Sequence, residues 1–298
     1  MPIDLAGVHI PTTTPFGGSG EVDLDAFAAN MRAGITRGVH GFVVGGSTGE
    51  AVLLDATERT NLWTTAAEVA SDQVLIAGTG AESTRTTIRM CKSAAHAGAH
   101  AVLVQPPAFY RGAMTPIALT AHFGAVADAS PVPVLVYQVP LKMSTIEFST
   151  EWIAGIAEHP NVVGMKDSRG DLDALSEIIE ATPDDFRVLV GSGALLHAAL
   201  EAGAVGGILG VANLVPDLCV EIFDAHREGR GDVAAALQAR VAPLHNGIVG
   251  VRGVPGVKAA LDALGRVGGA PRSPLQPLDG VGRTAVVHLL EEAGLTSN

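Results

Sequence analysis

The stretch Asn161-Val162-Val163-Gly164-Met165-Lys166 is a short apolar run that ends in a single lysine. Such a run, without alternating polar residues, is typical of a strand buried on both faces of a parallel sheet. Seven more short runs of this kind occur along the chain, and longer segments with helical patterns separate them. Strands are expected at residues 8–10, 41–44, 74–77, 101–104, 134–137, 162–166, 187–190 and 206–209.

The segments between these strands predict helices. Asp23, Ser83 and Ser149 precede three of them, and such side chains cap the first turn of a helix. Three segments close at a glycine, which favours a helix end. Helices are expected at residues 24–37, 56–70, 84–97, 116–128, 150–158, 172–181 and 195–202.

Eight alternating strand and helix units predict an α/β fold whose parallel sheet closes on itself, a (β/α)8 TIM barrel. A doubly wound open sheet is the alternative, but it would usually contain fewer units. Helical patterns at residues 215–227, 232–245, 257–264 and 281–293 exceed the one closing helix that a barrel needs. We therefore expect a catalytic barrel over residues 1–212 and a C-terminal helical bundle over residues 213–298 that closes on it.

The composition excludes several kinds of partner. Nineteen basic against 31 acidic residues give a net charge of -12, so nucleic acid is not expected as a partner. An anionic small substrate remains possible, because a few local donors can outweigh a distant net charge. Of the ten histidines only His96 and His100 have ligand-like spacing, but Gly98 should break the helix between them, so no metal site is expected.

The N-terminal residues and the cysteines indicate the compartment. Met1-Pro2-Ile3-Asp4-Leu5 lacks the features of a signal peptide, and no apolar run is long enough to span a membrane. Cys91 and Cys219 are the only cysteines and lie in different segments, so no disulfide framework is expected. These observations predict a cytoplasmic protein that is not membrane-bound.

Lys166 and Tyr137 end consecutive predicted strands, and α/β barrels carry their function at the carboxyl ends of the strands. The two side chains are therefore expected to meet at the mouth of the barrel. Burial disfavours an ammonium ion, and a neutral amine can attack a carbonyl carbon to form a Schiff base. A tyrosine hydroxyl beside it can transfer protons. The alternatives are a lysine whose amine simply reaches water and an ordinary interior tyrosine.

Two glycine-rich segments are candidate anion sites. Ser47 and Thr48 lie in the turn Gly45-Gly46-Ser47-Thr48-Gly49-Glu50, where N–H groups and hydroxyls can converge on a carboxylate or a phosphate. A plain tight turn is the alternative. The glycines after the seventh and eighth strands, such as Gly193 and Gly207, are candidates for a phosphate site of the kind that many such barrels have. They could equally serve to let a ligand approach the backbone.

Four motifs occur in order along the chain: Thr13-Thr14-Pro15-Phe16, residues 45–50, Tyr137-Gln138-Val139-Pro140 and Gly164-Met165-Lys166-Asp167-Ser168. Together they resemble the dihydrodipicolinate synthase / N-acetylneuraminate lyase superfamily of class I, pyruvate-handling aldolases. Stretches such as Tyr110-Arg111-Gly112 and residues 253–258 look most similar to its 4-hydroxy-2-oxoglutarate aldolase branch.

The resemblance implies a role for each matching residue. Lys166 would form the Schiff base with a 2-oxo acid such as pyruvate, and Tyr137 would transfer protons. The implied substrate-binding residues are Ser47 and Thr48 for the pyruvate carboxylate, Ile208 through a backbone group, and Ser168 and Ser192 near the distal part of the substrate. The family also implies a homo-oligomer, tetramer or dimer, in which an aromatic residue of a neighbouring subunit completes the site.

Three positions depart from the family pattern. In synthases of the family, an arginine in the turn after the tyrosine strand binds the carboxylate of the second substrate; in this chain the corresponding turn carries Lys142. A lysine keeps the positive charge but cannot form the two parallel hydrogen bonds of an arginine. Lys142 would either bind that carboxylate or be a solvated turn residue. Phe109 stands where the neighbour's tyrosine is expected, with Tyr110 one position later. Gln138 replaces an expected asparagine or serine. All three affect the second substrate more than the pyruvate half.

The predicted function is that of a lyase, a class I aldolase without metal or organic cofactor, that reversibly cleaves a 4-hydroxy-2-oxo acid such as 4-hydroxy-2-oxoglutarate to pyruvate and an aldehyde. The alternatives in the same family are 4-hydroxy-tetrahydrodipicolinate (dihydrodipicolinate) synthesis and sugar-acid aldol cleavage or dehydration. An alternative of another class is a phosphate-binding barrel isomerase that uses the glycines after the last two strands. A non-catalytic binding barrel would leave the paired lysine and tyrosine without a purpose.

Overall fold

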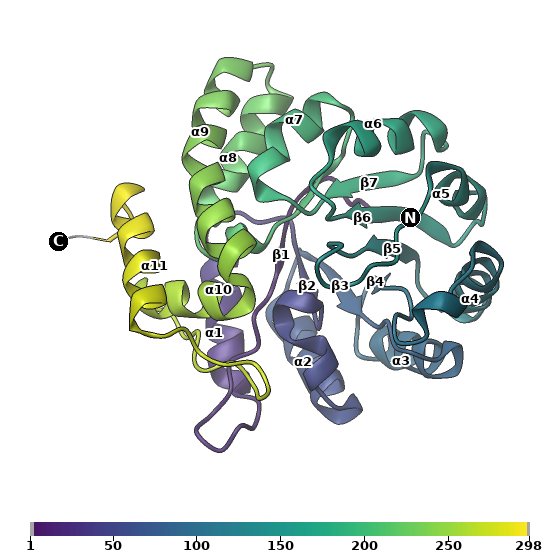
Figure 1. Ribbon diagram of the computed structural model, residues 1–298, viewed down its shortest axis with the longest axis horizontal. Coiled ribbons are helices and arrows are strands. Elements are labelled where there is room, and N and C mark those ends of the chain that lie inside the picture. The colour runs from purple at the N-terminus through teal and green to yellow at the C-terminus, as the bar shows by residue number, and fades with distance from the viewer. Residues whose placement is uncertain (1–2, 297–298) are drawn as a thin grey trace.

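The computed structural model describes residues 3–296, and its centre is a closed barrel of eight parallel strands in sequential order (Figure 1). Each strand pairs with the next, and β8 pairs with β1 to close the barrel. The fold confirms the predicted (β/α)8 barrel. The strands are β1 (Gly7–Pro11), β2 (Gly41–Val44), β3 (Val74–Gly78), β4 (Ala101–Val104), β5 (Val134–Gln138), β6 (Val162–Asp167), β7 (Arg187–Val190) and β8 (Gly206–Ile208).

Helices follow the strands and form the outer ring (Figure 1). The three predicted caps are confirmed: Asp23, Ser83 and Ser149 each accept a hydrogen bond from the backbone N–H three residues later. The helix at 84–97 ends as expected, because Gly98 has φ 96°, a conformation that L side chains rarely adopt. The ring contains α1 (Leu24–Ile35), α2 (Ala56–Val69), α3 (Thr84–His96), α4 (Pro116–Ala129), α5 (Thr150–Ala157), α6 (Leu172–Ala181), α7 (Leu196–Glu201) and α8 (Pro216–Arg227).

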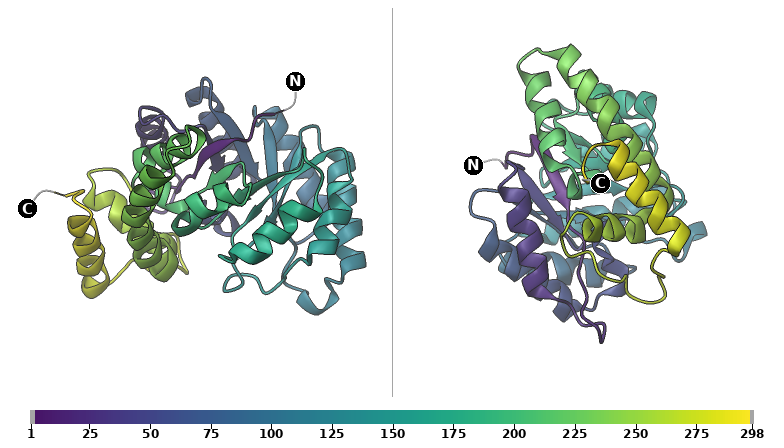
Figure 2. Two further views of the ribbon diagram at one scale, coloured as in Figure 1. Left: turned by 90° about the horizontal axis from the view of Figure 1, so that it is seen from above. Right: turned by 90° about the vertical axis from the view of Figure 1, so that its left-hand side faces the viewer.

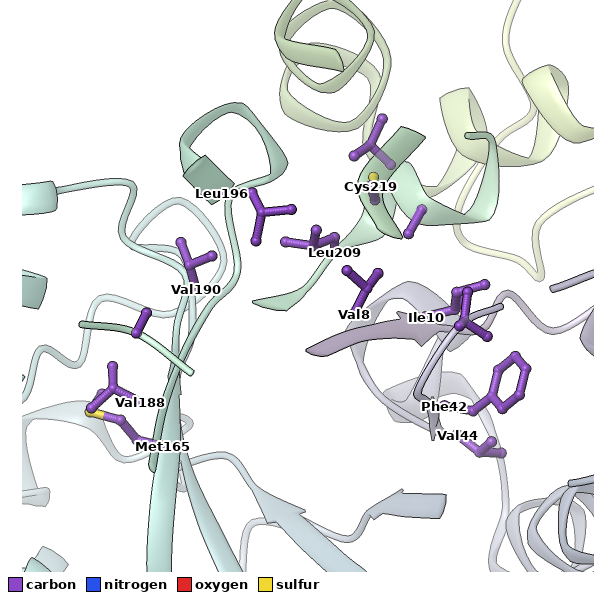
Figure 3. Packing of buried hydrophobic residues seen from close by; sticks show 14 of the residues in the cluster. Val8, Ile10, Phe42, Val44, Met165, Val188, Val190, Leu196, Leu209 and Cys219 are labelled. Carbon is purple, nitrogen blue, oxygen red and sulfur yellow. The ribbon is translucent and has the colours of Figure 1, made fainter. Parts of the chain in front are cut away.

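Both faces of the strands are buried, which explains their continuous apolar sequences. Successive side chains of a strand point to opposite faces, so one set fills the barrel and the other packs under the helices. Figure 3 shows the outer set, with Val8 and Ile10 of β1 and Phe42 and Val44 of β2. The inner set is a separate cluster that includes Leu135, Tyr137, Leu189 and Ile208. On β6, Met165 belongs to the outer set, so Lys166 beside it faces the inside of the barrel.

The C-terminal segment continues from α8, which packs against β1 and α7, into α9 (Gly231–Leu244), the π-helical turn η6 (His245–Gly250), α10 (Val251–Ala263) and α11 (Gly280–Glu292). Figures 1 and 2 show α11 at the edge of the molecule, farthest from the barrel. The helical extension is confirmed, and the division at residues 212/213 stays a prediction.

One helix in this segment differs from its prediction. The sequence predicts a helix only from residue 257, whereas α10 begins at Val251. Gly253 and Pro255 favour a break, and the structure accommodates them with a kink: Gly253 has φ 57° and ψ -146° inside the helix.

Between residues 3 and 296 the structure contains no helix long and apolar enough to cross a membrane.

Candidate active site

A cavity of about 400 Å³ opens at the carboxyl ends of the strands. Its walls come from the segments that follow β2, β5, β6, β7 and β8, and from η6 and α10. The structure therefore brings residues from most of the chain to one place, as a closed barrel should. The predicted site residues that line the cavity are Ser47, Thr48, Tyr137, Lys142, Lys166, Ser168 and Ser192.

Lys166 and Tyr137 are direct partners in the parallel register of β5 and β6. The Lys166 Nζ lies 4.6 Å from the centre of the Tyr137 ring. Only 6% of Lys166 and 4% of Tyr137 is exposed, so both side chains reach the cavity from the interior of the barrel. The arrangement presents an amine and a phenol hydroxyl to any molecule that enters the cavity.

Ser47 and Thr48 lie in a short 3-10 helix, η1 (Ser47–Gly49), in the cavity wall. The turn is fixed to the segment after β1, since the Thr14 hydroxyl donates to the Gly49 carbonyl at 2.8 Å. A Cβ at Gly49 would lie 2.9 Å from the Thr12 carbonyl oxygen, so only glycine allows this approach. The turn thus holds two hydroxyls rigidly within the same cavity as Lys166.

A buried ion pair anchors the same turn from behind. Glu50 accepts hydrogen bonds from the Lys258 Nζ at 2.6 Å and from the Arg272 N–H at 2.7 Å. The Glu50 and Lys258 side chains are almost fully buried, and burial lowers the pKa of Lys258 while Glu50 opposes that shift. Lys258 lies on α10, so this pair ties the C-terminal segment to the Ser47–Thr48 turn. Sequence reasoning missed it, although both residues stand inside motifs that marked the family.

The segment after β6 adds an arginine that the sequence did not single out. Arg169 lines the cavity, and its Nε donates to the Asp167 Oδ2 at 3.0 Å. Glu147 lies 3.5 Å from the same guanidinium. Ser168 sits between Asp167 and Arg169, and its N–H donates to the Gln138 carbonyl at 3.0 Å. The arginine is therefore held by two carboxylates.

His245 of η6 also enters the cavity, and no sequence signal pointed to it. Its Nε2 lies 3.3 Å from the Ser192 Oγ, and its Nδ1 accepts a hydrogen bond from the Gly193 N–H at 3.2 Å. Burial, with a smaller contribution from the charge of Lys142, lowers the pKa of His245 to about 4. Lys142 itself donates to the Gly250 carbonyl across the mouth of the cavity.

Three predicted site residues lie outside the cavity wall. Phe109 and Tyr110 are largely exposed and pack edge to face, with 5.1 Å between their ring centres. Ile208 is buried in the inner cluster with Tyr137 and Leu189. Their roles in substrate binding stay predictions. Across residues 3–296 no group of three or more His, Cys, Asp or Glu side chains is placed to hold a metal ion.

Comparison with known proteins gives the family. Residues 4–293, nearly the whole chain, match the model of the dihydrodipicolinate synthetase family. The chain belongs to the dihydrodipicolinate synthetase family. It is a class I aldolase-type lyase of that family, which agrees with the resemblance that its motifs indicate.

Its relatives within the dihydrodipicolinate synthetase family carry different activities in their names. A probable mitochondrial 4-hydroxy-2-oxoglutarate aldolase of Emericella nidulans is 41% identical over 80% of this chain and 79% of its own. A 4-hydroxy-tetrahydrodipicolinate synthase of Xanthomonas axonopodis pv. citri is 38% identical over 82% of this chain and 80% of its own. The crystal structure of the dihydrodipicolinate synthase of Acinetobacter baumannii, complexed with pyruvate, has a TM-score of 0.94 and 30% identity over 98% of this chain and 100% of that one.

The ion pair behind the turn gives a stability prediction. Lys258→Met leaves the Glu50 carboxylate buried without its cationic partner, which typically costs about 3–5 kcal/mol. We expect the free energy of unfolding, measured in urea, to fall by that amount. Lys92→Met, at an exposed position on α3, is the control and should change it by less than about 0.5 kcal/mol. A loss below about 1 kcal/mol for Lys258→Met, the scale of an exposed pair, would contradict the prediction.

Proposed function

We propose that this member of the dihydrodipicolinate synthetase family cleaves a 4-hydroxy-2-oxo acid to pyruvate and an aldehyde through an imine on Lys166. The observation that carries the proposal is the Lys166 amine, 4.6 Å from the Tyr137 ring centre, at the base of a cavity open to small molecules. An amine in this place can reach a carbonyl carbon, and the neighbouring hydroxyl can exchange protons with it.

The chemistry follows from these two groups. The Lys166 amine adds to the C2 carbonyl of the substrate, and loss of water from the carbinolamine gives a protonated imine. Loss of the C4 hydroxyl proton then drives cleavage of the C3–C4 bond, and the electron pair of that bond passes into the imine to form an enamine. The aldehyde leaves, C3 takes up a proton, and water hydrolyses the imine to release pyruvate. Tyr137 is the group placed to carry the protons of these steps.

The two ends of the substrate have separate binding groups in this proposal. The pyruvate carboxylate would lie at the Ser47–Thr48 turn, and the distal carboxylate of 4-hydroxy-2-oxoglutarate would face Lys142, Ser168 and Ser192. The name of the Emericella relative supports this substrate, while relatives named as synthases are almost as similar to the chain. The lysine at position 142 supports it too, because the chain lacks the synthase arginine at that turn. Sugar-acid cleavage or dehydration is the remaining reaction of the same family.

The phosphate-binding isomerase has less support. The Gly193 N–H already donates to His245, and the Gly193 carbonyl accepts from the Gln238 amide at 2.9 Å. Gly207 does not line the cavity. A phosphate at these glycines would have to displace existing hydrogen bonds, whereas an imine on Lys166 displaces none.

Two further parts of the proposal concern the assembly and the compartment. We propose a homo-oligomer in which Phe109 or Tyr110 reaches the cavity of a neighbouring subunit, because both aromatic rings are exposed and would be covered there. A cytoplasmic location stays a prediction, and the mitochondrial relative shows that the family also works elsewhere.

The imine gives the most direct prediction. Incubation with pyruvate and borohydride should add a reduced pyruvyl group to the peptide that contains Lys166, because reduction makes the imine permanent. Intact-protein and peptide mass spectrometry would locate it. Lys166→Ala should lose both the adduct and the lyase activity while its circular dichroism spectrum stays that of the wild type. An adduct on another lysine, or none, would refute the mechanism.

The proposed chemistry uses a lysine imine as its electron sink, so it needs no metal or organic cofactor. Activity is expected to survive exhaustive treatment with EDTA followed by gel filtration. The measurement is pyruvate release before and after treatment. A loss that a divalent cation restores would contradict this prediction.

Lys142 gives a test of the distal site. If its amine binds the distal carboxylate, Lys142→Ala should lower kcat/KM for 4-hydroxy-2-oxoglutarate roughly tenfold, which corresponds to a loss of about 1.5 kcal/mol in transition-state stabilisation. This is the lower end of the scale for a charged hydrogen bond, and we expect it because the Lys142 side chain is exposed. Imine trapping with pyruvate should persist. Lys92→Ala is the matched control. Equal kcat/KM for wild type and Lys142→Ala would show that Lys142 is a solvated turn residue.

A further inference from the structure

His245 lies in the wall of the cavity, but the proposed cleavage gives it no task. It is the first residue of the π-helical turn η6, directly after α9, and its side chain is half-buried against the segment that follows β7. Both ring nitrogens have partners in that segment: the Gly193 N–H on one side and the Ser192 hydroxyl on the other. These two contacts determine where the ring carries its proton.

The Gly193 contact fixes the tautomer. A backbone N–H can only donate, so the Nδ1 that lies 3.2 Å from the Gly193 nitrogen must be unprotonated. Burial lowers the pKa of His245 to about 4, so the ring is neutral near pH 7 and carries one proton. That proton is therefore on Nε2.

The tautomer in turn orients Ser192. The protonated Nε2 lies 3.3 Å from the Ser192 Oγ and donates to it. The oxygen then acts as acceptor toward His245, which leaves its own proton free to point into the cavity. Ser192 lines the same cavity as Lys142 and Ser168. It follows β7, whereas the Ser47–Thr48 turn follows β2, and these two strands are not neighbours in the barrel.

The frame around His245 is rigid. The Gly193 carbonyl accepts from the Gln238 Nε2 of α9 at 2.9 Å, and the Gln238 Oε1 accepts from the His197 backbone N–H at 3.0 Å. A Cβ at Gly193 would lie 2.4 Å from Val211 and 3.2 Å from the His245 Nδ1. A side chain at position 193 would therefore collide with Val211 and press against the His245 ring.

We propose that His245 is a positioning residue that holds Ser192 as a hydrogen-bond donor to the distal end of the substrate. It thereby selects 2-oxo acids with an acceptor oxygen at that end over those that end in an alkyl group. This inference rests on the proposed lyase function and deepens it, because it assigns the preference for the distal group to a residue outside the imine chemistry.

A pair of variants separates this role from simple packing. The amide nitrogen of glutamine reaches the position of Nε2, whereas the shorter asparagine reaches only that of Nδ1. His245→Gln should therefore keep the donor to Ser192, and His245→Asn should keep the contact with Gly193 but lose that donor. His288→Asn, at an exposed position on α11, is the control.

The measurement is the ratio of kcat/KM for 4-hydroxy-2-oxoglutarate, which ends in a carboxylate, to kcat/KM for 4-hydroxy-2-oxopentanoate, which ends in a methyl group. We expect the ratio to fall about tenfold in His245→Asn and in Ser192→Ala, and to stay within about twofold of the wild type in His245→Gln and His288→Asn. The double variant Ser192→Ala/His245→Asn should fall no further than either single variant, because both changes remove one shared interaction.

Two further measurements separate the possible failures. The 15N spectrum of the His245 ring should show a protonated Nε2 and an unprotonated Nδ1, and the opposite tautomer would overturn the inference. Imine trapping with pyruvate should persist in all variants. An unchanged substrate ratio in His245→Asn, with trapping intact, would overturn the inference alone. Failure of the wild type to trap pyruvate would refute the proposed function, and the inference with it.

Discussion

A closed parallel barrel leaves few positions where a side chain can touch both the packed interior and a solvent-filled cavity. Inward-facing residues alternate with outward-facing ones along each strand, and the inward-facing residues below the mouth pack together and fill the barrel. The register of β5 and β6 sets Tyr137 directly beside Lys166 at this boundary. An amine is thus held among apolar neighbours with one open side, and the other parts of the site are arranged around it.

The C-terminal segment supplies the wall that the barrel lacks. His245, Gly250 and Val257 line the cavity, yet none of them belongs to the strands or their following loops. The segment is attached through the Glu50–Lys258 pair, and a buried charge without a partner is strongly unfavourable. The turn that carries Ser47 and Thr48 and the helix that carries Lys258 therefore depend on each other for their positions.

The sequence predicted the features that are local and left out those that are not. Strands, helix caps and the end of α3 at Gly98 depend on residues that are close together in the sequence. The barrel, and the pairing of Tyr137 with Lys166, could therefore be inferred. The ion pair of Glu50 with Lys258 joins positions 208 residues apart, and no periodicity reports such a contact. The π-helical turn was missed for a related reason, since its glycines indicate only that a regular helix is interrupted.

The two halves of the cavity are under different constraints. The proposed pyruvate half is built from strand ends and a turn whose geometry the barrel fixes, while the proposed distal half is built from loops and η6. This difference explains how relatives with different named reactions can be almost equally similar to this chain.

Within the distal half the cations are not equivalent. Arg169 is held between Asp167 and Glu147, which cancel its charge, whereas Lys142 is bound only to the Gly250 carbonyl. Lys142 has no carboxylate partner to leave, so it gives up less than Arg169 would in binding an incoming carboxylate.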